Sequence, residues 1–80
     1  MFADTAGQAL LRQYAAALSP IKWGWELRAT SKKFRAAHGI DQGHPLFLAI
    51  QAIHGAHDRR VGGLSSPAMA DEETNKVIQS

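Results

Sequence analysis

The chain has 80 residues, no cysteine, and nine lysines and arginines against seven aspartates and glutamates, for a net charge of +2. A chain of this length builds one small core, so two separate functional domains are excluded. The lack of cysteine excludes disulfide scaffolds, thiolate nucleophiles, and zinc or iron–sulfur sites built on cysteine. The first residues lack the basic and apolar stretches of a secretory signal, and the longest uncharged stretch, between Asp41 and Asp58, is too short and too polar to span a bilayer. We therefore expect a small cytoplasmic protein with no membrane association.

The first predicted helix covers residues 5–18, with Asp4 or Thr5 as its N-terminal cap. Helical spacing gives it two adjoining apolar ridges, which are Leu10, Tyr14 and Ala17, and Leu11, Ala15 and Leu18. Ser19–Pro20 then ends this element and opens the next, because serine is favoured at the N-cap and proline at the first helical position. The junction is short, so we expect the first two elements to pack as neighbours.

The segment 21–38 carries two patterns. With a period of two, apolar and polar residues alternate over residues 21–29, which is typical of a half-buried strand and would give an α+β fold with a short hairpin there. With a helical period, one apolar stripe runs from Trp23 through Leu27 and Phe34 to Ala37. The helix accounts for the whole segment, whereas the strand accounts for its first half and has no evident partner strand. We predict a helix with Trp23 in the core and keep the hairpin as the alternative.

Gly39 suits the C-terminal cap of this second helix, and Pro45 opens a third helix that ends at Gly62–Gly63. The inner stripe of the third helix is Leu46, Ala49, Ile50, Ile53, His57 and Val61. Ser66–Pro67 repeats the serine and proline signal before a segment with few apolar residues.

The predicted fold is mainly α: a small bundle of three helices plus a short C-terminal helix, with the third helix at its centre. We expect residues 1–65 to form a single helical domain. Residues 66–80 are expected to form either the short C-terminal helix or a mobile acidic tail.

Four histidines lie within a short stretch, at positions 38, 44, 54 and 57. Imidazole and carboxylate ligands suit zinc, so His54, His57 and Asp58 are the candidate metal ligands. Their spacing differs from a zinc helix, which places two histidines at i and i+4 with a glutamate beside the first. We therefore predict no metal or other cofactor and expect the histidines to be partly buried or to cap helices.

No catalytic constellation emerges from the sequence. Gly63–Ser66 lacks the second glycine of a nucleophile elbow, and Gly62–Gly63 is not followed by the lysine and hydroxyl residue of a phosphate-binding loop. The adjacent carboxylates of residues 71–73 lie in a solvated run, so we do not expect burial there to raise the pKa of any of them. We predict that the protein is not an enzyme.

The charge is polarised along the chain. Between Arg12 and Arg35, six basic residues against Glu26 alone give +5, whereas the residues from Ser66 onward carry −2. If the second element is helical, a tryptophan sits among cations on one face; this face consists of Trp25, Arg28, Lys32 and Arg35, with Lys22 and Lys33 at its edges. Tryptophan and arginine are favoured anchors at protein interfaces, and such cations also hold phosphates.

The sequence therefore predicts a non-enzymatic regulator or inhibitor that binds an acidic protein or nucleoprotein surface through this basic face. Direct binding of DNA or RNA by the same face is the alternative, and a homodimer that covers Trp25 also stays open. Compact proteins of phages and mobile elements that block host machinery, anti-CRISPR inhibitors among them, are one class with this profile. No motif in the chain points to a particular family.

Overall fold

The computed structural model describes residues 5–80, which form four helices and no strand. They are α1 (Thr5–Leu18), α2 (Gly24–His38), α3 (Phe47–Val61) and α4 (Pro67–Gln79). The predicted mainly α bundle with a C-terminal helix is confirmed. The alternative hairpin near residues 21–29 is wrong, because residues 24–29 belong to α2. Within residues 5–80, no helix has the length and apolar character needed to cross a bilayer.

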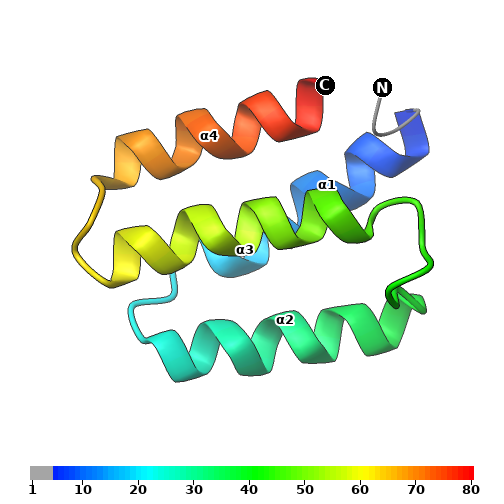
Figure 1. The fold of residues 1–80 in the computed structure, drawn as a ribbon, viewed down its shortest axis with the longest axis horizontal. Helices are drawn as coiled ribbons and strands as arrows, with labels where there is room; N and C mark the ends of the chain where they lie inside the picture. Colours follow the sequence, from blue (N-terminus) through cyan, green and yellow to red (C-terminus); the bar gives the residue numbers. More distant parts are fainter. Residues whose placement is uncertain (1–4) are drawn as a thin grey trace.

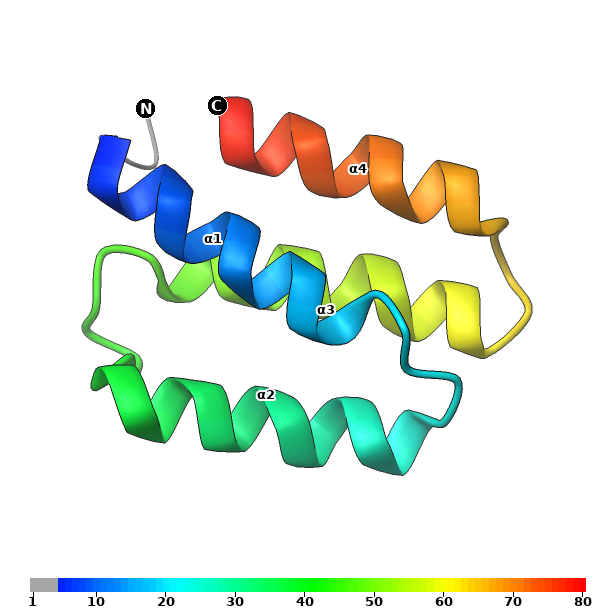
Figure 2. The same ribbon diagram turned by 180° about the vertical axis from the view of Figure 1, so that it is seen from behind.

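The helices form two layers. In Figure 1, α2, α3 and α4 lie side by side with α3 in the middle, and each runs antiparallel to the next. Figure 2 shows α1 crossing the other face of this layer, over α3. Both α1 and α3 contact all the other helices, whereas α2 and α4 lie on opposite sides of α3 and do not contact each other.

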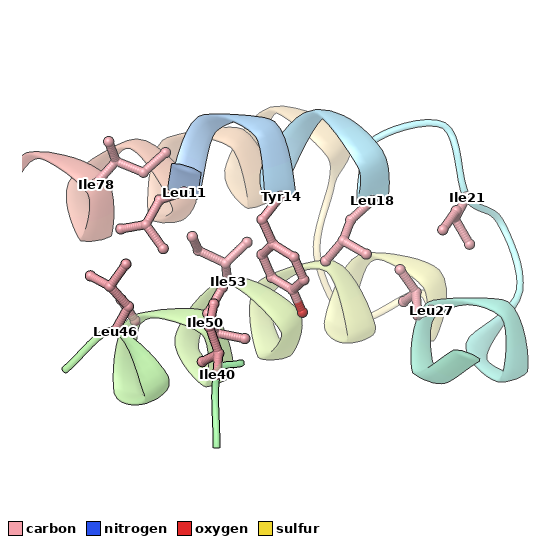
Figure 3. Packing of buried hydrophobic residues seen from close by; sticks show 11 residues of the cluster. Leu11, Tyr14, Leu18, Ile21, Leu27, Ile40, Leu46, Ile50, Ile53 and Ile78 are labelled. Carbon is pink, nitrogen blue, oxygen red and sulfur yellow. The ribbon is translucent and has the colours of Figure 1, made fainter. Parts of the chain in front are cut away.

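The core lies between α1 and α3. Leu11, Tyr14 and Leu18 of α1 are fully buried and face Ile50 and Ile53 of α3 (Figure 3). Burying one such side chain contributes about 1.5–3 kcal/mol, so this apolar contact contributes substantially to stability. The remaining members of the cluster are Ile21, Leu27, Ile40, Leu46, Ala49 and Ile78.

One hydrogen bond inside the bundle joins α1 to α2. The hydroxyls of Tyr14 and Ser31 lie 2.6 Å apart and both residues are buried. A buried hydroxyl without a partner would lower stability by about 1–3 kcal/mol, and here each satisfies the other. The pair therefore fixes which side of α2 faces α1.

The start of α2 differs from the prediction. The helix begins at Gly24, and Trp23 is its N-cap residue in an extended conformation, with φ −122° and ψ 135°. Ile21 is buried in the loop ahead of it, whereas Trp23 is 63% exposed. The prediction that Trp23 lies in the core is wrong, because the chain is still extended at this position and Ile21 occupies the apolar site instead.

Arg60 of α3 holds this loop in place. Its Nη2 donates to the carbonyl of Ile21 at 2.9 Å and to that of Leu18, at the end of α1, at 3.3 Å. The Leu18 carbonyl also accepts the backbone N–H of Ile21 at 3.1 Å, so Arg60 adds a second bond to the turn that ends α1. A side chain of the third helix thus fixes the connection that leads into α2.

The ends of α2 and α4 follow the predicted signals. Gly39 has a φ of 65°, and Ile40 N–H donates to the carbonyl of Arg35 at 2.9 Å, which is the expected glycine cap. Ser66 accepts a hydrogen bond from the backbone of Met69 at 3.1 Å and so caps α4. Ile78 of α4 belongs to the core cluster.

Candidate binding surface

The basic residues of α2 lie outside its buried stripe, and Trp25 is exposed on the same helix. The helix buries Leu27 and Ser31 on its inner side. Trp25 is 64% exposed. Of the predicted cations, Lys22, Arg28, Lys32 and Lys33 are exposed and Arg35 is half-buried. With Trp23, the beginning of α2 presents two exposed indole rings.

These cations do not form one flat face. Arg28, Lys32 and Arg35 line a groove of about 310 Å³ that we call the α2–α3 groove, and α3 contributes Gln51 and His54 to it. Lys32 and Arg35 also border a second hollow of about 500 Å³, which extends to the loop after α2. Trp25, Lys22 and Lys33 line neither of these two spaces. Arg28 and Lys32 are exposed and also reach the outer side of the helix, so the groove and the outer side share these two cations.

The cations of α2 have no carboxylate partner among residues 5–80. The ion pairs of this part of the chain join Arg59 to Glu73, and Lys76 to Glu72 at 3.4 Å. Both involve α4, whose acidic residues lie across α3 from α2 (Figure 1). The acidic segment therefore neither neutralises nor covers the basic surface.

Two nitrogen atoms at the α2–α3 groove are buried without a hydrogen-bond partner. They are Nε of Arg35 and Nε2 of His54, and both residues line the groove. Leaving a buried polar group unpaired costs about 1–3 kcal/mol, and more for a charged group. Sequence reasoning placed Arg35 at this surface but considered His54 for a metal and did not single out Gln51. Helical periodicity shows which residues share a face of one helix, and it does not show which residues of another helix lie opposite.

The histidines do not assemble a metal centre. Among residues 5–80, no three histidine, aspartate or glutamate side chains are grouped so that they could hold a metal ion. Of the candidate ligands, His54 lies at the α2–α3 groove, His57 is buried, and Asp58 is exposed. His44 acts as a local cap, because its Nδ1 accepts the backbone N–H of Leu46 at 3.0 Å.

His57 is a buried partner of Arg60. Its Nδ1 accepts a hydrogen bond from Arg60 Nε at 3.2 Å, and its exposed fraction is 2%. Burial, and then the positive charge of Arg60, lower the pKa of His57 below its ordinary value. The Nε of an arginine always carries a hydrogen, so Nδ1 of His57 is the acceptor in this pair.

Comparison of the chain with known protein families, with curated proteins and with solved structures finds no match.

Proposed function

We propose that this protein is a non-enzymatic binding protein that docks on the acidic surface of a larger protein or nucleoprotein through the outer side of α2. The observation that carries the proposal is the exposure of Trp25 among cations that have no ion-pair partner within residues 5–80. A large exposed aromatic ring within a charged surface is typical of an interaction site.

The outer side of α2 has the composition of a protein interface. Helical spacing places Trp25, Ala29, Lys32 and Ala36 along one outward line, and all of them are exposed. Arg28 lies on one flank of this line and Lys33 on the other. An apolar centre with a charged rim is the usual anatomy of a protein–protein interface.

Direct nucleic-acid binding is less well supported by the same surface. Affinity for a phosphate backbone comes from several cations that each neutralise a phosphate. The outer side of α2 carries Lys32 with Arg28 and Lys33 on its flanks, but the whole chain carries only +2. An acidic protein surface instead requires one aromatic anchor and flanking charges, which α2 provides.

The test is affinity capture from the native cell extract with the wild-type chain, Trp25→Ala and Met69→Ala, with and without nuclease. Trp25 is 64% and Met69 51% exposed, so both variants should fold with the melting temperature of the wild type. We expect Trp25→Ala to lose a specific protein partner that nuclease does not remove. Met69→Ala should keep it, because Met69 lies on α4, which does not contact α2.

Two results would contradict this function. If Trp25→Ala captures the partner as well as the wild type does, the outer side of α2 is not the docking surface. If capture disappears with nuclease and the purified protein binds DNA or RNA with a steep salt dependence, direct nucleic-acid binding is the correct function.

A further inference from the structure

The α2–α3 groove has a lining unlike the outer side of α2. Three cations of α2 and two polar side chains of α3 surround it, and Ile50 gives it an apolar part. Its volume of about 310 Å³ lies at the lower end of the range for small-molecule sites, which begins at about 300 Å³. Trp25 takes no part in this lining.

The cations of the groove repel one another, which lowers the stability of α2. Arg28 and Lys32 are four residues apart on α2, and Lys32 and Arg35 are three apart, so successive positive charges are neighbours on the helix surface. Like charges at these spacings repel each other and destabilise a helix. No aspartate or glutamate lines the groove to offset this repulsion. An anion in the groove would offset it.

The groove also holds hydrogen-bond donors without acceptors. Arg35 is always protonated, so its buried Nε always carries a hydrogen, and this atom has no acceptor. Nε2 of His54 is buried and unpartnered in the same way, and it donates in the tautomer that carries its hydrogen there. A ligand with several acceptor oxygens would satisfy these atoms if the Arg35 and His54 side chains turned toward it, since both residues line the groove.

We propose that the α2–α3 groove is a binding site for a phosphate group, either as the free ion or as a small phosphate ester. A phosphate offers up to two negative charges and several acceptor oxygens, which match the three cations of the groove better than the single charge and two oxygens of a carboxylate do. Arginine in particular forms paired hydrogen bonds with phosphate oxygens. This site goes beyond the proposed docking function and does not rest on it, since the groove is formed without Trp25.

The test is a titration of the full chain followed by backbone amide NMR, at fixed ionic strength, with inorganic phosphate, adenosine monophosphate and acetate in separate arms. We expect saturable shifts at the amides of Ser31, Lys32 and Gln51 with phosphate or the ester, and far weaker binding of acetate. Tighter binding of inorganic phosphate would identify the free ion as the ligand, and tighter binding of adenosine monophosphate would identify the ester.

Lys32→Gln and Lys33→Gln make a matched pair. Both remove one exposed positive charge from the middle of α2, but only Lys32 lines the groove. Losing one charged contact should weaken phosphate binding about tenfold in Lys32→Gln. Lys33→Gln should change it by less than about twofold, because an exposed charge outside the groove acts only through screened attraction.

Trp25→Ala should bind phosphate like the wild type, so failure of the docking function and failure of the phosphate site give different results. Equal weakening in Lys32→Gln and Lys33→Gln would overturn the proposal, because it would indicate attraction by net charge alone. Shifts that do not saturate, or acetate binding as tight as phosphate, would overturn it as well.

Discussion

At the residue scale, His57 makes the stability of the bundle depend on pH. Burial, and then Arg60, lower its pKa below the ordinary value of 6.5, and Asp71 opposes them. The unfolded chain therefore binds a proton more readily than the folded chain does. The free energy of unfolding should be fully retained above about pH 6.5 and should fall as the pH drops from there toward the pKa of the folded state. Urea unfolding at a series of pH values between about 7.5 and about 5.5 measures this fall.

His57→Gln should flatten that dependence. Glutamine does not titrate, although the variant should be less stable near neutral pH because Arg60 loses its present acceptor. His38→Gln is the matched control, since it replaces an exposed histidine and should leave the fall with pH in place. An unchanged pH dependence in His57→Gln would show that another group causes the acid destabilisation.

At the element scale, the beginning of α2 shows what local sequence patterns could and could not determine. Helical periodicity correctly placed Leu27 inside and Trp25 outside. It could not determine that Ile21 rather than Trp23 fills the core, since both belong to an apolar pattern. The loop is held by a contact that is distant in sequence, since Arg60 donates to the carbonyl of Ile21 from 39 residues away along the chain. The α2–α3 groove likewise could not be determined from local patterns, because His54 and Arg35 line the same groove only through the packing of two helices.

Replacing a glycine by alanine should change the free energy of unfolding in opposite directions at Gly39 and at Gly55. Gly39 ends α2 with a φ of 65°, and an added Cβ there would meet nothing within 4 Å, so Gly39→Ala should lower stability by about 1 kcal/mol through the backbone alone. Gly55 lies inside α3, and its added Cβ would meet only a flexible atom of Arg59, Nη1, at 3.6 Å. Gly55→Ala should therefore raise stability by about 0.5–1 kcal/mol.

Urea unfolding of both variants against the wild type measures the two changes. Each substitution also stiffens the unfolded chain to a similar extent, so the difference between the variants isolates the folded backbone. If both changes had the same sign, the left-handed conformation of Gly39 would not be the cause.

At the scale of the whole molecule, the polarised charge of the sequence becomes an arrangement in space. The basic helix α2 and the acidic helix α4 lie on opposite sides of α3 (Figure 1). The sequence predicted the two charged segments but not their separation, since an acidic tail could equally have folded over the basic face. The separation follows from burial, because α4 packs Ala70, Thr74 and Ile78 inward. A molecule with this asymmetry should approach an acidic partner with α2 in front.

The position of α4 can be tested through Ile78, which is 2% exposed. It belongs to the same core cluster as Leu11, and Figure 3 shows the two side chains at the same end of the cluster. Ile78→Ala should lower the free energy of unfolding by about 2–4 kcal/mol through lost burial and the space left behind. Met69→Ala on the same helix should change it by less than about 0.5 kcal/mol, because Met69 is 51% exposed. Thermal and urea unfolding measure both variants. If Ile78→Ala proved as mild as Met69→Ala, α4 would be an appendage to the bundle, and nothing in its packing would then keep the acidic residues away from α2.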